Sequence, residues 1–168
     1  MDINIKMDLA GVRDLFRRLR KAGGDLTPVM KRIGATVTQS VKRNFREGGR
    51  PERWAPLSMA TLFAGKKSKF VTKRGRFRKG VEEKFRNRKV LIKESHLMGS
   101  VNWRASANRV EVGTNKVYAA IHQFGGEAGR KRKRVMIPAR PYLMVQNEDI
   151  AEIRTAITAH IMAAEKGR

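Results

Sequence analysis

The stretch TPVMKRIGATVTQSVKRNF, residues 27–45, has the periodicity of a helix with one apolar face. Every fourth residue along it is apolar: Val29, Ile33, Val37, Val41 and Phe45. Side chains at this spacing lie on one side of an α-helix, where they can face a core. Thr27 is a helix-capping residue type, and Pro28 fits the first helical position. The glycines and proline at 48–51 end the pattern, so the sequence predicts an amphipathic helix over this stretch.

Two flanking segments have a similar pattern. Residues 9–22 repeat apolar side chains at three- and four-residue spacing, with Asp8 as a candidate N-cap. Residues 147–164 do the same, with Asn147 as the candidate cap and an acidic pair in the positively polarised first turn. The sequence therefore predicts three amphipathic helices.

Strand patterns occur between the second and third of these helices. Within SVNWRASANRVEVGT, residues 100–114, apolar side chains alternate on either side of a turn at 107–108. The alternating residues are Val101, Trp103, Ala105, Val110 and Val112. This pattern predicts a β-hairpin with one buried face. Farther along, we expect a short helix over 118–124 and a strand over 135–137, which Pro138 halts.

The predicted fold class is α+β. We expect a single domain over residues 1–168, in which a small antiparallel sheet with a β-hairpin packs against about three amphipathic helices. The chain is long enough to bury a core without disulfides, and it contains no cysteine. The absence of cysteine is compatible with a reducing cytoplasm.

The positive charge is local. The formal net charge is +23 and the sequence pI is about 11.4. Residues 66–93 hold thirteen Lys or Arg against two acids, and the RKRKR run at 130–134 adds five cations, so the two segments carry +16 of the total. We expect residues 64–92 to form a long basic loop or insertion, with a short helix near 81–88, because few of its side chains are apolar.

A localised field of this size attracts polyanions. Phenylalanines at 70, 77 and 85 could add base stacking to the phosphate contacts. An acidic protein surface is the alternative partner, and composition does not separate the two. The candidate polyanion-binding residues are Lys66, Lys67, Lys69, Lys73, Arg74, Arg76, Arg78, Lys79, Arg86, Arg88, Lys89, Arg130, Lys131, Arg132, Lys133 and Arg134.

The sequence predicts no catalytic residue, no metal site and no cofactor. The histidines at 96, 122 and 160 lie far apart, and no Asp or Glu is within helical reach of His122 to orient it as a general base. Adjacent acids at 82–83 and 148–149 would point to different sides of a helix. Phosphate-loop, dinucleotide and nucleophile-elbow motifs do not occur. The N-terminus lacks a secretory signal pattern and no run is long enough to span a membrane, so we expect no membrane association.

Four segments, taken in order, carry a family resemblance. They are NFREGGRPERWAPLSMATL at 44–62, ESHLMGSV at 94–101, VEVGTNKVYAAIHQFGG at 110–126 and IPARPYL at 137–143. This succession resembles the phage virion morphogenesis family, the tail-completion proteins of the Mu G and P2 S type. The resemblance covers about residues 25–165. It weakens over 64–92, where this chain is longer and more basic than the family pattern.

The resemblance implies a structural virion protein that completes the tail or joins it to the head. It implies a homo-oligomeric ring around the DNA channel, six copies being favoured, with hairpins of neighbouring subunits pairing edge to edge. Its partners would be other neck or tail proteins and the DNA in the channel. The protein would be assembled in the host cytoplasm and would reside in the virion. The alternative function is a cytoplasmic nucleic-acid-binding protein that uses its basic segment.

The motif residues are candidates for interface or architectural roles: Trp54, Leu57, Tyr118, His122, Gln123, Phe124, Gly125, Gly126, Pro138, Arg140 and Pro141. We read His122 and Gln123 as hydrogen-bonding residues that tie a short helix to a strand or loop. Arg140 lies between two prolines that restrict its backbone. Two roles are open for it: a contact with a neighbouring subunit, or a salt bridge within its own subunit.

Overall fold

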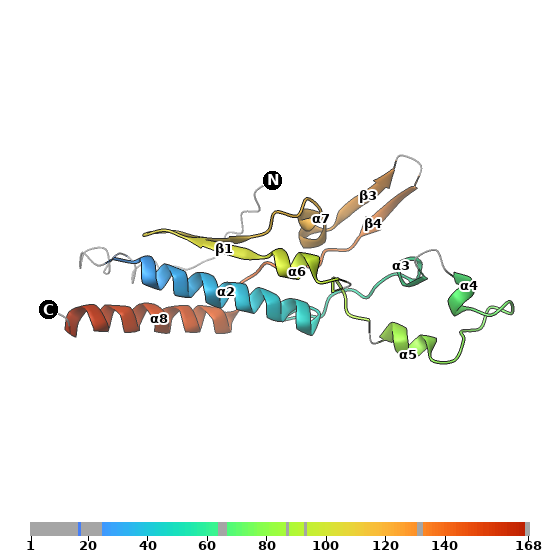
Figure 1. Cartoon of the computed structure of the whole chain (residues 1–168), viewed down its shortest axis with the longest axis horizontal. Helices are drawn as coiled ribbons and strands as arrows, with labels where there is room; N and C mark the ends of the chain where they lie inside the picture. Colours follow the sequence, from blue (N-terminus) through green and yellow to red (C-terminus); the bar gives the residue numbers. More distant parts are fainter. Residues whose placement is uncertain are drawn as a thin grey trace.

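The computed structural model of the chain describes Arg17 and residues 25–63, 67–86, 88–92, 94–130 and 133–166. Two long helices, α2 (Thr27–Glu47) and α8 (Asn147–Lys166), lie side by side, and a β-hairpin lies along the other side of α2 (Figure 1). We call this part the body. Two projections leave the same end of the body. The predicted helix at 9–22 falls outside the described residues except for Arg17, which is helical.

Helix α2 confirms the predicted amphipathic helix, and it lies at the centre of the core between α8 and the hairpin. Its five apolar residues at four-residue spacing are all buried, and Val41 and Phe45 are fully inaccessible. The prediction of Thr27 as the N-cap is wrong, because Thr27 is the first residue of the helix. The N-cap position is occupied by Leu26, whose side chain makes no capping hydrogen bond. The nearby carboxylate of Asp25 accepts a hydrogen bond from the Thr27 N–H at 2.9 Å, and this hydrogen bonding lowers the pKa of Asp25.

Helix α8 packs its predicted apolar face against α2. Ile153 and Ile157 are buried there. The prediction of Asn147 as the cap is wrong, since Asn147 is the first residue of the helix. The carboxylate of Asp149 instead accepts a hydrogen bond from the Gln146 N–H at 2.7 Å, which is one half of a capping box.

The predicted hairpin is confirmed. It consists of β1 (Asn102–Ala105) and β2 (Val110–Gly113), and its register places Trp103 opposite Val112. Its apolar side faces α2. The two elements approach closely at Gly34, where a Cβ would lie 2.7 Å from the Trp103 indole.

The helix α6 (His96–Ser100) precedes β1, and the expected short helix α7 (Ala119–Phe124) follows β2.

The second hairpin, which forms one of the projections, was only half predicted. The expected strand at 135–137 lies in β4 (Lys133–Ile137), but its partner β3 (Gly126–Arg130) was missed. The two hairpins are separate two-stranded sheets, so the prediction of one sheet is corrected while the α+β class is confirmed. We call β3 and β4 the ribbon; it projects from the body beside α7 (Figure 1).

The other projection is the basic lobe, residues 59–89. It contains three short helices, α3 (Met59–Phe63), α4 (Lys67–Phe70) and α5 (Val81–Arg86). The expected helix near 81–88 is confirmed by α5. The sequence did not predict the small apolar cluster found here, in which four phenylalanine rings pack together, with Phe63 centred 5.6 Å from Phe85 and 6.2 Å from Phe70 and Phe77. Val71 and Val81 are buried beside them.

Candidate functional site

Three of the four family-like segments, 44–62, 110–126 and 137–143, meet in a junction at the base of the two projections. Gln123 of α7 reaches the segment after β4, where its Oε1 accepts hydrogen bonds from the N–H groups of Tyr142 (3.0 Å) and Leu143 (2.9 Å). Its Nε2 donates to the Leu143 carbonyl at 3.1 Å. Gln123 is buried, so its amide satisfies backbone groups that water does not reach. The sequence predicted this role, a helix tied to a neighbouring loop, without the partners.

Arg140 lies at the centre of this junction and is buried. Its guanidinium donates to the carbonyls of Ala55 (3.1 Å) and Pro56 (3.2 Å), and its backbone N–H donates to the His122 carbonyl at 2.7 Å. Burial lowers the pKa of Arg140. Among the residues that the structure describes, no carboxylate pairs with Arg140, so its acceptors are carbonyls. Its contact with a neighbouring subunit stays a prediction.

Aromatic side chains hold the same junction to α2. Tyr142 is fully buried with its ring centred 5.0 Å from that of Phe45, and Trp54 meets Phe45 edge-on at 5.7 Å. The Trp54 indole N–H donates to the Pro141 carbonyl at 3.1 Å, and the Asn44 amide donates to the Tyr142 carbonyl at 2.9 Å. Burial raises the pKa of Tyr142 to about 12. Trp54 thus anchors its segment to Phe45 of α2 and to the Pro141 carbonyl.

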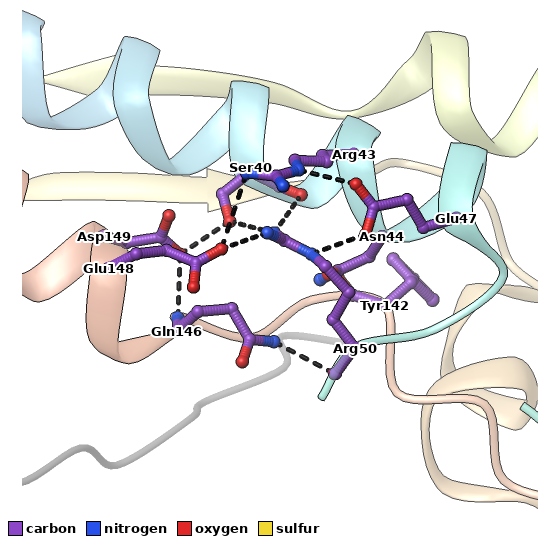
Figure 2. A network of polar contacts seen from close by, with 9 residues as sticks. All are labelled: Ser40, Arg43, Asn44, Glu47, Arg50, Tyr142, Gln146, Glu148 and Asp149. Atoms are coloured by element: carbon purple, nitrogen blue, oxygen red, sulfur yellow. Dashed lines mark hydrogen bonds and ion pairs between the residues drawn. The ribbon is translucent and has the colours of Figure 1, made fainter. Parts of the chain in front are cut away.

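A second polar network joins α2 to the start of α8 (Figure 2). The guanidinium of Arg50 donates to the Ser40 Oγ (2.7 Å), the Ser40 carbonyl (3.1 Å) and the Asn44 Oδ1 (2.8 Å), and it pairs with the Glu148 carboxylate. Ser40 in turn donates to the buried Asp149 carboxylate at 2.6 Å. The partners are far apart in the sequence, 109 residues in the case of Ser40 and Asp149. The sequence did not predict this network, for which its one signal was an acid at the third position of α8.

The histidines do not come together. His96 pairs with Glu94, and His160 contacts the Asp25 carbonyl. His122 is half-buried, and its Nδ1 meets no hydrogen-bond partner among the described residues, so the side-chain bond predicted for His122 is not found at this atom. Burial lowers its pKa, and the charge of Arg140 adds to the effect. Within the described ranges, no group of three or more His, Asp or Glu side chains could hold a metal ion. That the chain is not an enzyme stays a prediction.

The remaining motif residues shape the base of the ribbon. Gly125 has a φ of 74°, and a Cβ there would lie 2.8 Å from the Ala139 nitrogen. Gly126 also has a positive φ, 138°. Both glycines therefore permit a sharp reversal of the chain after α7. Pro138 is exposed, whereas Pro141 and Leu57 are half-buried.

Large apolar side chains gather in the open around α7 and the ribbon. Val117 is 97% exposed, Met136 69%, Val135 61%, Phe124 60% and Tyr118 40%. We call these five residues the apolar edge. Single exposed apolar residues are ordinary, whereas a group of this size around one hairpin is a candidate contact surface.

The structure places most of the described candidate polyanion-binding residues in the lobe and the others at the far ends of the ribbon strands. Of the RKRKR run, Arg130 ends β3 and Lys133 begins β4. Arg134 pairs with Glu127 across the strands at 2.8 Å. Arg88 is half-buried and donates to the Leu62 carbonyl at 3.3 Å. Lys66, Lys131 and Arg132 fall outside the described residues, as do the side chains of Lys67, Arg86, Arg130 and Lys133.

No helix in the described part of the chain is both long enough and apolar enough to cross a bilayer. The contacts of both networks run between distant parts of one chain, which is the arrangement of an architectural site. The hydrogen bonds that Gln123, Arg140, Trp54 and Asn44 donate from their side chains all end on backbone carbonyls, so they set the shape of the junction.

The sequence matches the phage virion morphogenesis family over residues 7–162, and the chain belongs to this family. It is 36% identical over 142 residues to the Mu-like prophage FluMu G protein 2 of Haemophilus influenzae, with 84% of this chain and 83% of that protein covered. It is 40% identical over 53 residues to the "Putative capsid assembly protein G" of Escherichia phage Mu, with 32% of this chain and 34% of that protein covered. No solved structure matches significantly. Membership supports a structural or assembly role in forming the phage virion.

Proposed function

We propose that this chain is a tail-completion or neck protein, which finishes the phage tail or joins it to the head as a ring of subunits around the DNA channel. Family membership over residues 7–162 is the observation that carries the proposal. A hexamer is the favoured copy number, as expected from the resemblance. Neighbouring neck or tail proteins are its further partners.

The apolar edge supports the oligomeric part of the proposal. A two-stranded ribbon is marginally stable by itself, and here β4 exposes Val135 and Met136 at successive positions, which point to opposite faces. Both faces of the ribbon therefore have apolar area that a neighbour could cover. In addition, each strand has one edge without a strand partner among the described residues, which can pair with a second copy.

The test is the mass of the full chain in solution, measured alone and after mixing with tail or connector components. The expected result is a ring, either of the chain alone or formed on its neighbour as template. Replacing Val135 and Met136 by Ser should reduce assembly, because it removes apolar area from the ribbon. Met162→Ser is the matched control, since Met162 is also exposed (58%) but lies on α8. A chain that stays monomeric and never enters particles would overturn the proposal.

The alternative, a cytoplasmic nucleic-acid-binding protein, is favoured by one observation: the exposed cations of the basic lobe. It predicts nucleic-acid binding without entry into particles. Incorporation of the chain into virions therefore separates the two functions, whatever its affinity for nucleic acid.

A further inference from the structure

We propose that the basic lobe binds the phosphate backbone of double-stranded DNA, without reading base sequence. The inference deepens the proposed function, on which it rests for the place where the lobe would meet DNA. It is carried by three features of the described lobe: cations without carboxylate partners, a turn with a defined backbone that presents them, and aromatic rings that pack against one another.

The described cations of the lobe lack carboxylate partners. Eight exposed side chains contact no carboxylate of the described residues: Lys69, Lys73, Arg74, Arg76, Arg78, Lys79, Lys84 and Lys89. The only acids of the lobe are Glu82 and Glu83, at the start of α5. Elsewhere carboxylates pair with Arg43, Arg50 and Arg134. Like charges this close repel one another, and an external polyanion relieves that repulsion.

A turn between α4 and α5 presents the charges on a defined backbone. Val71 and Phe77 form an antiparallel bridge, and the Thr72 N–H donates to the Arg76 carbonyl at 2.8 Å. The Gly75 N–H donates to the Thr72 carbonyl at 3.0 Å, and Gly75 has a φ of 79°, which favours glycine. The turn therefore carries four cations within six residues: Lys73, Arg74, Arg76 and Arg78. Since the backbone is shaped before binding, less ordering entropy is lost on contact.

The packing of the aromatic rings indicates backbone contact rather than base stacking. Phe85 lies within 6.2 Å, centroid to centroid, of each of the other three rings of the cluster. Proteins that stack on bases present aromatic rings in the open. Of the four rings, Phe77 has a partly open face, at 40% exposure. The rings thus form the small core that holds the turn in place, and the cations are the groups of the turn that can contact a ligand.

The same arrangement favours DNA over an acidic protein. Protein interfaces have an apolar centre and are depleted in lysine, whereas protein–DNA interfaces are more polar and much more positive. In the described lobe, most apolar side chains pack around the ring cluster, with Met59 and Phe77 partly exposed, whereas the lysines and most arginines lie outward. Phosphate contacts of this kind give affinity without sequence preference.

The experiment measures affinity of the full chain for a short duplex of mixed sequence over a range of salt concentrations. The lobe variant changes four turn cations to Gln: Lys73, Arg74, Arg76 and Arg78. The control variant changes four exposed body cations to Gln: Lys31, Arg46, Arg104 and Arg154. Both variants lose four positive charges. Comparing them therefore distinguishes binding at the lobe from a general effect of net charge. Circular dichroism and thermal melting check that each variant folds.

We expect the lobe variant to bind about a hundredfold more weakly near physiological salt, and its plot of log K against log salt to be shallower by about 3 to 4, since each phosphate contact contributes about 0.9. The control should lose less than about tenfold. Equal losses in both variants, or an unchanged lobe variant, would overturn the proposal. So would binding of polyglutamate as tightly as DNA with the same dependence on the lobe.

Phe77→Leu tests the part of the proposal that limits contact to the DNA phosphate backbone and excludes base stacking. It should leave duplex affinity unchanged within about threefold, because Leu keeps an apolar side chain in the cluster and phosphate contacts need no ring. A large loss on single-stranded DNA would show stacking and contradict it. Failure of DNA binding with normal entry into particles would refute this inference alone. DNA binding through the lobe without entry into particles would instead refute the proposed function.

Discussion

The side-chain amide of Gln123 holds Leu143 at both ends of its backbone: Oε1 accepts from the Leu143 N–H at 2.9 Å, and Nε2 donates to its carbonyl at 3.1 Å. One glutamine of α7 thus imitates the pairing that a neighbouring strand would supply. It does so at the point where the chain leaves the ribbon and returns to the body.

Gln123→Leu should lower the free energy of unfolding by about 3 kcal/mol, because it leaves three buried backbone groups unpaired, at about 1 to 3 kcal/mol each before relaxation. Urea unfolding followed by circular dichroism measures this. Gln39→Leu, at an exposed position of α2, is the control and should change stability by less than about 0.5 kcal/mol. Similar urea midpoints for the two variants would contradict the role assigned to Gln123.

Arg50→Gln should cost about 2 to 3 kcal/mol, because the guanidinium makes charged hydrogen bonds to Ser40 and Asn44 at a site where its side chain is 10% exposed. Arg43→Gln is the comparison. Its ion pair with Glu47 is open to solvent, so this variant should lose much less stability than the Arg50 variant. Chemical denaturation of both variants in the same buffer checks the difference, and an Arg43 effect as large as that of Arg50 would refute it.

Gly34→Ala should destabilise the chain by about 1 to 2 kcal/mol, although alanine favours helices, since its Cβ would lie 2.7 Å from the Trp103 ring. Gly99→Ala in α6 is the matched control, since a Cβ there meets nothing within 4 Å. It should be neutral or stabilising. Thermal melting distinguishes them, and a double mutant with Trp103→Leu should recover part of the loss.

The pH dependence of stability should reveal Tyr142. Burial raises its pKa from the ordinary 10 to about 12, so between these values the unfolded chain has released a proton that the folded chain keeps. Stability is therefore lost as pH rises from about 10 to 12, by about 2 to 3 kcal/mol from this group. Tyr142→Phe removes the titration and only a long 3.4 Å hydrogen bond. The free energy of unfolding, measured at about pH 9 and at about pH 11.5, should fall more between these two values for the wild type than for this variant.

Phe85→Ala should loosen the basic lobe and leave the body intact, because Phe85 contacts the three other rings of the cluster, all of which belong to the lobe. Limited trypsin digestion should cut the lobe faster in the variant, while the main melting transition of the body shifts by less than about 3 °C. A large shift of that transition would show that lobe and body unfold together.

The sequence predicted the elements whose signals are local. The apolar residues of α2 recur at the helical period along one segment, and the β1–β2 hairpin alternates around a short turn, so each pattern is complete within one element. Strand β3 was missed because GEAGR has two glycines and no large apolar side chain; it forms by pairing with β4. The cap of α8 was misassigned because Asp149, and not Asn147, makes the capping bond.

The site was predictable in its residues and not in its contacts. Trp54, Gln123 and Arg140 were named from a family pattern, but their acceptors are backbone carbonyls, which every residue has and no sequence distinguishes. The phenylalanine cluster was missed for a related reason. Its members are spread from 63 to 85 among cations, so the segment as a whole is strongly polar. The average composition therefore gives no sign that four of its side chains form a core.

The bonds of Arg140 to Ala55 and Pro56 join the root of the basic lobe to the segment that leaves the ribbon. Both projections are therefore mounted on one base. A change in the length or charge of the lobe would leave the two Arg140 bonds in place, because both end on backbone carbonyls, which every residue has. In that sense Arg140 fixes where the two projections are attached and leaves the chemistry of their outer surfaces open.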